Sequence, residues 1–138
     1  MPCTNPPIST LGGLTLAPGV YCTPPAGAMG LTGNLTLNGP ANAVWVFQIG
    51  SSLTTASGSV ILSGGAQASN VWFQVGSSAT IGTAYGMQGN ILALTSITLD
   101  PTANLVLGRA LARNGAVNLG TGDNIKLPPA AAATCTFP

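Results

Sequence analysis

Charge is almost absent from this sequence. Only five of its 138 residues are ionic, the formal net charge is +1, and glutamate and histidine do not occur. Without a basic patch, the chain has no electrostatic attraction for nucleic acid, an anionic membrane or an acidic substrate. Without paired carboxylates or histidines, it lacks the groups that glycosidases and other acid-base enzymes require, so we expect no enzymatic activity.

Long apolar runs are missing as well. No segment approaches the roughly 20 apolar residues that a membrane-spanning helix needs, and 19 glycines and 11 prolines interrupt the chain throughout. The first ten residues, MPCTNPPIST, have neither the basic nor the apolar region of a secretory signal. The cysteines nevertheless indicate a mature extracellular segment, so we expect a secreted protein.

Cysteine occurs three times, which leaves one thiol over after any pairing within the chain. Cys3 and Cys22 flank a short segment rich in proline and turn residues, and this spacing favours them as a disulfide. A pair that involves Cys135 stays open. Zinc is a poor alternative, because three dispersed cysteines without histidine lack the ligand spacing of a structural site. We therefore expect no metal and no cofactor.

What the sequence contains is short β-rich runs bounded by glycine, asparagine, proline and serine, with almost no helical periodicity. These runs repeat: FQIGSSLTTAS starts at Phe47, FQVGSSATIGT at Phe73, ILALTSITLDP at Ile91 and LARNGAVNLGT at Leu111, with offsets of 26, 18 and 20 residues. Asn-Gly hairpin turns occur only at 38–39 and 114–115. Unequal offsets with few hairpins favour the coils of an all-β solenoid over a sandwich.

Alternation along each repeat assigns the side chains to faces. Two mostly apolar columns are predicted to point inward: Leu53, Ala79, Ile97 and Val117, then Thr55, Ile81, Leu99 and Leu119. The residues between them are predicted to point outward: Ser52, Ser78, Ser96 and Ala116; Thr54, Thr80, Thr98 and Asn118; Ala56, Gly82, Asp100 and Gly120. The result is a grid of small, mostly uncharged groups. We expect the Asp100 side chain to start a corner through a local bond to the backbone.

The strand before this grid has a different outer side. Its inward set aligns Trp45, Phe47 and Ile49 with Val71, Phe73 and Val75. Its outer side is predicted to carry an apolar strip that consists of Val46, Trp72, Leu92 and Ala112, beside Gln48 and Gln74. A contiguous apolar strip is typical of an interaction surface, so we expect a cover or a homodimer there. Alternation places Arg113 inward, where an unpaired charge would be costly to bury. We therefore expect its side chain to reach a corner or the open end of the last coil, or the register to slip there.

Several long blocks, in order, carry a resemblance to a known family: LGGLTLAPGVY, NAVWVFQIGSSLTTASGS, GGAQASNVWFQVGSSATIGT, ILALTSITLD and GRALARNGAVNLGTGDNI. From about Leu11 to Ile125 the chain resembles the microbial ice-binding proteins of the DUF3494 type. The resemblance implies a right-handed, discontinuous β-solenoid of triangular section that binds ice through one flat face without turnover. We expect this domain over residues 1–128 and a tail or linker over 129–138.

The resemblance has one departure. Family members carry an N-terminal strand segment and a long α-helix before the part that resembles STLGGLTLAPGVY, and this chain starts after the point where that helix would end. The helix would be expected to cover the apolar strip. Its absence predicts a bare strip and an unpaired strand edge at the wide end of the solenoid. Either the chain is a truncation or another molecule supplies the cover.

The resemblance and the outward grid together predict an ice crystal surface as the partner. The predicted ice-binding residues are Ser52, Thr54, Ala56, Ser78, Thr80, Gly82, Thr83, Ser96, Thr98, Asn118, Gly120 and Thr121. Outward serine and threonine are also ordinary solvated residues of a strand. The alternative function is an adhesive or carbohydrate-binding module, for which Trp72 is the sole good aromatic candidate.

Overall fold

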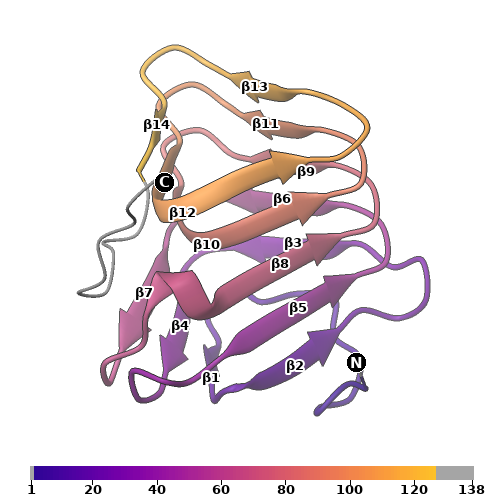
Figure 1. The fold of residues 1–138 in the computed structure, drawn as a ribbon, viewed down its shortest axis with the longest axis vertical. Helices are drawn as coiled ribbons and strands as arrows, with labels where there is room; N and C mark the ends of the chain where they lie inside the picture. The colour runs from indigo at the N-terminus through magenta and orange to yellow at the C-terminus, as the bar shows by residue number, and fades with distance from the viewer. Residues whose placement is uncertain (1, 127–138) are drawn as a thin grey trace, which may run out of the picture.

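The computed structural model describes residues 2–126, which form short strands and a single turn of 3-10 helix (Figure 1). The tail predicted for 129–138 and Cys135 lie outside the described residues. The elements are β1 (Thr15–Leu16), β2 (Gly19–Cys22), β3 (Met29–Thr32), β4 (Leu35–Asn38), β5 (Trp45–Ile49), β6 (Leu53–Ala56), β7 (Val60–Ser63), η1 (Ala68–Asn70), β8 (Val71–Val75), β9 (Ala79–Ile81), β10 (Gly86–Ala93), β11 (Ile97–Leu99), β12 (Asn104–Ala112), β13 (Val117–Leu119) and β14 (Asn124–Ile125). No helix within residues 2–126 is long and apolar enough to cross a membrane.

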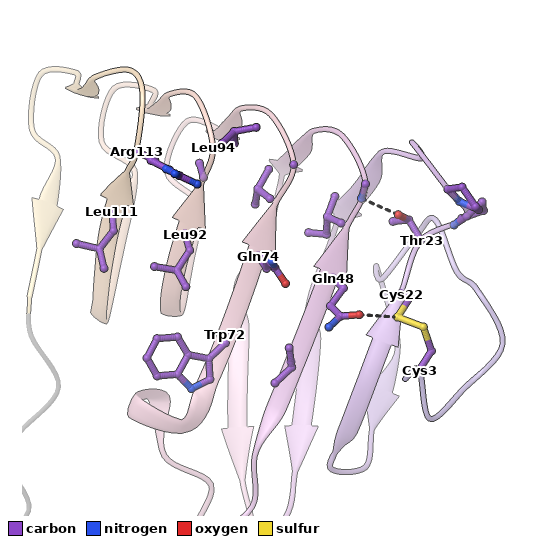
Figure 2. Close-up of a pocket in the computed structure, with 18 of the residues that line it drawn as sticks. Cys3, Cys22, Thr23, Gln48, Trp72, Gln74, Leu92, Leu94, Leu111 and Arg113 are labelled. Carbon is purple, nitrogen blue, oxygen red and sulfur yellow. Dashed lines mark hydrogen bonds between the residues drawn. A yellow bond between two sulfur atoms is a disulfide. The ribbon is translucent and has the colours of Figure 1, made fainter. Parts of the chain in front are cut away.

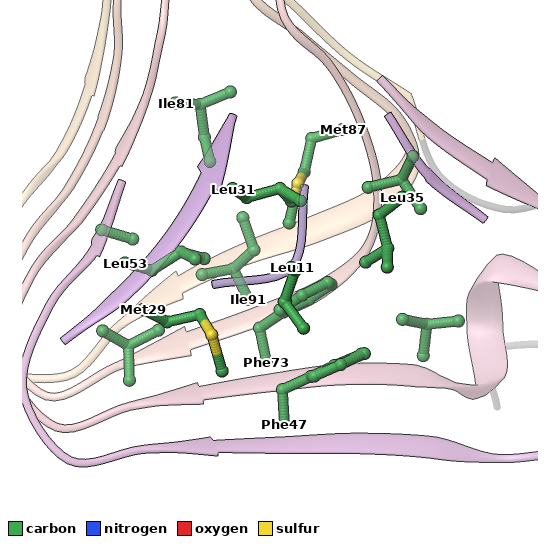
Figure 3. Packing of buried hydrophobic residues seen from close by; sticks show 14 of the residues in the cluster. Leu11, Met29, Leu31, Leu35, Phe47, Leu53, Phe73, Ile81, Met87 and Ile91 are labelled. Atoms are coloured by element: carbon green, nitrogen blue, oxygen red, sulfur yellow. The ribbon is translucent and has the colours of Figure 1, made fainter. Parts of the chain in front are cut away.

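The strands form three parallel sheets, which enclose the core on three sides (Figures 1 and 3). The sheet orders are β1-β4-β7, β14-β12-β10-β8-β5-β2 and β13-β11-β9-β6-β3. Successive turns of the chain contribute successive strands to each sheet, and all of the pairings are parallel within the described part. The predicted β-solenoid is therefore confirmed, with about five turns and no α-helix among residues 2–126.

The unequal repeat offsets have a structural cause at one corner. In the coil that contains β7, residues 64–70 leave β7, pass through η1 and return into β8. In the next coil, β10 crosses this corner directly, because its first residue bridges to Ser59 and its later residues pair with β8. Gly89, at φ 113°, lies where β10 passes from one side to the other. The corner therefore absorbs the difference in length, and the other two sides keep their strands in step.

Apolar columns fill the interior, as alternation predicted (Figure 3). Tyr21, Phe47 and Phe73 stack on neighbouring strands, with ring centroids 5.6 and 4.7 Å apart. Such stacked rings add about 0.5–1.5 kcal/mol per pair beyond the area that they bury. The Tyr85 hydroxyl donates to the Gly33 carbonyl at 3.0 Å, and the Trp45 indole donates to the Leu16 carbonyl at 3.3 Å. The buried polar atoms of these rings are thus satisfied.

The strand edge at the N-terminal end of the solenoid, which was predicted to be unpaired, is paired. Residues 3–16, here called the N-terminal segment, run along that edge and pair with it. Thr4 N donates to the Val20 carbonyl at 2.8 Å, Ile8 N to Cys22 at 2.9 Å and Leu11 N to Gly30 at 2.9 Å. The edge is therefore not unpaired, since this segment supplies a partial coil on top of it. Alternation in the segment is too short for sequence reasoning to have assigned it.

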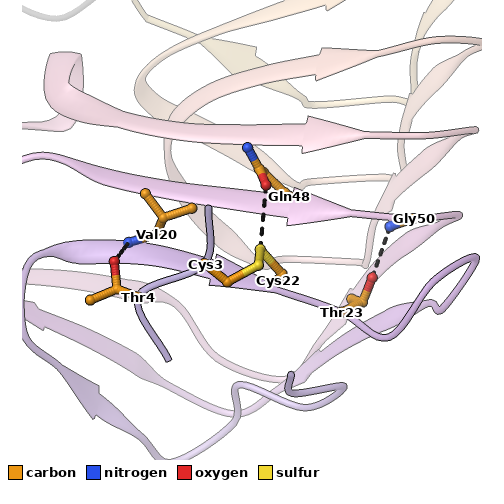
Figure 4. The surroundings of a disulfide bond; sticks show 7 residues. All are labelled: Cys3, Thr4, Val20, Cys22, Thr23, Gln48 and Gly50. Atoms are coloured by element: carbon orange, nitrogen blue, oxygen red, sulfur yellow. Dashed lines mark hydrogen bonds between the residues drawn. A yellow bond between two sulfur atoms is a disulfide. The ribbon is translucent and has the colours of Figure 1, made fainter. Parts of the chain in front are cut away.

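A disulfide anchors the start of this segment. Cys3 and Cys22, the pair that the sequence favoured, are bonded across 19 residues of chain (Figure 4). The Thr4 hydroxyl accepts a hydrogen bond from Val20 N at 3.0 Å, next to the disulfide. In the entropic view, closing a loop of this size stabilises a fold by about 3 kcal/mol.

The far end of the solenoid differs from the predicted register. Met87 pairs with Leu105 and Gly89 with Gly108, so β12 holds one more residue than β10 over this stretch. The bulge reverses the parity that follows it. Ala112 then packs against the core, and Leu111 points outward at 50% exposure. Arg113 is exposed at the corner after β12, which confirms the predicted slip.

Candidate functional site

The outer face of the five-stranded sheet carries the predicted grid. Its strands pair in the predicted register, which joins Leu53 to Ala79, Ile97 and Val117, and Thr55 to Ile81, Leu99 and Leu119. The inward residues of the first three coils are at most 1% exposed, so they hold the sheet firmly from below. In the last coil, Val117 and Leu119 are 38% and 57% exposed because no described strand stacks on β13.

Three threonines form the centre of this face. Thr54, Thr80 and Thr98 are direct partners on neighbouring strands, and Asn118 continues the same column. We call these four residues the threonine column. Thr54 is exposed, and Thr80 and Thr98 are half-buried between their neighbours. Among the described residues their hydroxyls take part in no side-chain hydrogen bond, in contrast to Thr55, whose hydroxyl accepts from Gly82 N. The three hydroxyls are thus free to bind water.

The serine column lies beside the threonine column and has a partly structural role. Ser96 N donates to the Ser78 hydroxyl, and Ala116 N donates to the Ser96 hydroxyl, each at 3.3 Å. Ser52 begins the same column, and all three serines are partly accessible. These bonds between coils fix the spacing of the neighbouring corner.

The column on the other side is less uniform than the sequence indicated. Ala56 is exposed, whereas Gly82 and Gly120 lie where adjacent coils approach closely. A Cβ on Gly82 would collide with the Thr55 carbonyl oxygen, and one on Gly120 would collide with the Pro101 backbone. These glycines therefore permit coil stacking, and only their backbones contribute to the surface.

The corner beyond this column holds Thr83 and Thr121, both of which are exposed. Asp100, which is half-buried at the same edge, closes its turn through its backbone carbonyl, to which Ala103 N donates at 2.9 Å. Among residues 2–126, the Asp100 side chain accepts no hydrogen bond, so the expected local bond to the backbone is absent there. Asp123 makes such a bond instead, because its carboxylate accepts from Gly120 N.

Two positions that belong to this face were missed from the sequence. Gly30 pairs directly with Thr54, and Thr10 of the N-terminal segment bridges to Gly30. Thr10 is exposed, while the next residue, Leu11, is fully buried in the core. Alternation thus places Thr10 in line with the threonine column. The segment GAMGLT, offset by 24 residues from SSLTTA, was the available signal for Gly30.

Charge lies mostly away from the face. The Arg109 guanidinium donates to the Asn90 side-chain oxygen at 3.0 Å, and Arg113 lies at the edge of a groove on the six-stranded sheet. Asp100 and Asp123 are the charged residues at the margin of the grid among the described residues, and Asp123 accepts from Gly120 N. Within residues 2–126, Cys, Asp, Glu and His side chains form no cluster that could hold a metal ion.

A groove lies on the six-stranded sheet where the sequence predicted the apolar strip (Figure 2). The strand pairing shows that the predicted alignment of the strip was wrong. Val46 and Trp72 pair directly, but Trp72 pairs next with Asn90, and Leu92 pairs with Gln74 and Leu111. The partly exposed residues Val46, Trp72 and Leu92 and the exposed Leu111 therefore belong to two neighbouring columns, and Leu111 replaces the inward-facing Ala112. Homodimerisation through this surface stays a prediction.

Comparison with known proteins agrees with this geometry. A family model described as Ice-binding-like matches residues 2–125. The "Ice-binding protein" of Nostoc sp. (strain HG1) is 58% identical over 113 residues, which are 80% of this chain and 41% of the relative. The "Ice-binding protein" of Flavobacterium frigoris (strain PS1) is 35% identical over 105 residues, which are 75% of this chain and 37% of the relative. This chain spans about two fifths of these curated relatives.

Solved structures show the same fold. The crystal structure of an ice binding protein from an Antarctic biological consortium has a TM-score of 0.81 at 46% identity, over 88% of this chain and 55% of that chain. The DUF3494 domain of Shewanella frigidimarina ice-binding protein 1 has a TM-score of 0.80 at 35% identity, over 86% of this chain and 50% of that chain. The family model covers nearly the whole described chain, so the protein belongs to the Ice-binding-like (DUF3494) family, a family of ice-binding proteins rather than enzymes.

Proposed function

We propose that this chain adsorbs to ice through the outer face of the five-stranded sheet and thereby causes thermal hysteresis or inhibits recrystallisation. The observation that carries the proposal is the threonine column, in which Thr54, Thr80 and Thr98 lie in direct register on neighbouring strands. The family membership supports ice as the partner. The assignment of the face rests on the geometry of these residues.

The face has the physical properties that such adsorption requires. Parallel strands place neighbouring members of a column about 4.8 Å apart, and outward residues on one strand recur at about 6.6 Å. Threonine offers a methyl group and a hydroxyl on a stiff β-branched frame, so ordering it costs little entropy on binding. The buried residues Leu53, Ala79 and Ile97 hold the backbone beneath it. A rigid neutral array of this kind can order water and join a crystal plane.

The site test replaces Thr80 with tyrosine. The ring would stand above the plane and obstruct Thr54 and Thr98, which lie about 4.8 Å away on either side. Thr36 provides a matched control, because it is also a half-buried outward threonine at a strand centre, but on the three-stranded sheet. We expect Thr80→Tyr to abolish most thermal hysteresis and Thr36→Tyr to retain it.

Folding must be shown to be intact in both variants. Surface substitutions usually change stability by about 0.5 kcal/mol or less, so circular dichroism and thermal melting are expected to match the wild type. Undiminished thermal hysteresis of folded Thr80→Tyr would exclude this face. Absence of hysteresis, ice shaping and recrystallisation inhibition from the wild type would exclude the function.

The disulfide supports a secreted location as part of this proposal. Structural disulfides persist in oxidising compartments and are rare in the cytosol. The Cys3–Cys22 bond joins the N-terminal segment to β2, so the fold uses it structurally. Fractionation of the native source, with detection in the culture medium or cell envelope, is the corresponding test.

A further inference from the structure

We infer that the N-terminal segment is a working part of the ice-binding face, contributed through Thr10 and held in place by the Cys3–Cys22 disulfide. This inference rests on the proposed function and extends its site. The sequence placed the site on later coils only, and the structure adds Thr10, a residue of the N-terminal segment that precedes β1. The size of the site then depends on the Cys3–Cys22 disulfide, because this bond holds the segment that carries Thr10.

The pairing of the segment places Thr10 on the face. Thr10 bridges to Gly30 in parallel, and Gly30 pairs with Thr54. Gly30 N donates to the Ser9 carbonyl and Leu11 N donates to the Gly30 carbonyl, at 2.8 and 2.9 Å. With Thr10 and Gly30 the column has six positions, which span about 24 Å at about 4.8 Å per strand. Thr54 to Asn118 alone span about 14 Å on the same spacing.

The attachment of the segment depends on a few contacts. Leu11 is fully buried, and beyond it Gly13 N donates to the Asn34 carbonyl at 2.7 Å. Gly12 permits the close approach, because a Cβ there would collide with the Thr32 carbonyl oxygen. At the start of the segment, the Cys3–Cys22 bond and the Thr4 pairing with Val20 hold it against β2 (Figure 4). Within residues 2–126 the segment is hydrogen-bonded to the rest of the fold along one side, so in this chain it should open before the inner coils do.

Thr10→Tyr and Thr15→Tyr form the decisive pair of variants. Thr15 is an exposed residue of the same segment, but it lies in β1 and pairs with Thr36 on the three-stranded sheet. Shape complementarity governs binding at such a face, so we expect Thr10→Tyr to lower thermal hysteresis at least about twofold at equal concentration. We expect Thr15→Tyr to match the wild type, with the same melting temperature in both.

The disulfide is tested in a Cys135→Ser background, which removes the remaining thiol. There, Cys3→Ser with Cys22→Ser should lower thermal hysteresis and speed amide hydrogen exchange at residues 4–16, with slower exchange kept in β6, β9 and β11. If that variant does not fold, the Thr10 and Thr15 pair decides the matter alone. Wild-type hysteresis in folded Thr10→Tyr would overturn this inference and leave the proposed function intact if Thr80→Tyr is inactive. No hysteresis in the wild type would overturn both.

Discussion

Gly30→Thr should strengthen the ice-binding face. Gly30 is the one position between Thr10 and Asn118 in the column that carries no side chain. A Cβ there would meet only the Ser9 carbonyl oxygen, at 3.8 Å, which is ordinary van der Waals contact. Gly30 is not among the residues with positive φ, so a β-branched residue fits its backbone. The substitution would make the run of threonines continuous from the N-terminal segment to β11.

Gly30→Thr should have two separate effects, one on stability through the backbone and one on thermal hysteresis through the face. Replacing a strand glycine by a compatible residue stabilises by about 0.5–1 kcal/mol through the unfolded chain. For a chain of this size that raises the melting temperature by roughly 2–5 °C. Thermal hysteresis should rise, because the gap between Thr10 and Thr54 closes.

The assay compares thermal hysteresis and thermal melting of the wild type, Gly30→Thr and Gly30→Ala at equal concentrations. Gly30→Ala gains the same backbone restriction without the hydroxyl, so it should be stabilised with a smaller gain in hysteresis. A fall in hysteresis for a Gly30→Thr protein that is at least as stable as the wild type would refute the reasoning. It would mean that the column must have a gap there, or that ice contacts another face.

Two further predictions concern the core and pH. Phe47→Ala should destabilise the fold by about 3–5 kcal/mol and lower the melting temperature by roughly 10–20 °C, because Phe47 is fully buried in the aromatic stack. Urea unfolding measures this change, with Phe47→Leu as the milder control. Equal urea midpoints for Phe47→Ala and the wild type would contradict the packing. Burial raises the pKa of Tyr21 and Tyr85 above 10.0, although a hydrogen bond from Asn5 opposes the shift for Tyr21. The contribution of these two groups to the free energy of unfolding is therefore fully present below pH 10 and falls as pH rises above 10, because the tyrosines ionise first in the unfolded chain. Melting at pH 7 to 11 tests this, and a stability that stays constant or rises above pH 10 would count against it.

The repeats predicted most of the fold and the centre of the candidate site. FQIGSS and FQVGSS fix the register of β5 and β8, and the columns that follow them pair as alternation requires. The bulge in β12 was not predictable, because it places Leu107, which is not a glycine or an asparagine, at φ 55°. Thr10 was missed for another reason. The two segments share only the short runs LGGLTL at 11–16 and LTGNLTL at 31–37, which begin after Thr10 and Gly30 and differ in length, so the pairing of these two residues is shown by the tertiary structure.

The corner formed by residues 64–70 has a consequence for how this surface can vary. Wide and narrow coils differ by several residues, yet their face strands stay in direct register. Coil length and face geometry are thus set by separate parts of the chain. The number of residues at that corner can therefore change without disturbing the spacing of the threonines. A single residue inserted between β8 and β9 would instead shift every outward residue of its coil. The fold should therefore tolerate insertions at the corner formed by residues 64–70 and should not tolerate them at the corner that leads into the five-stranded sheet.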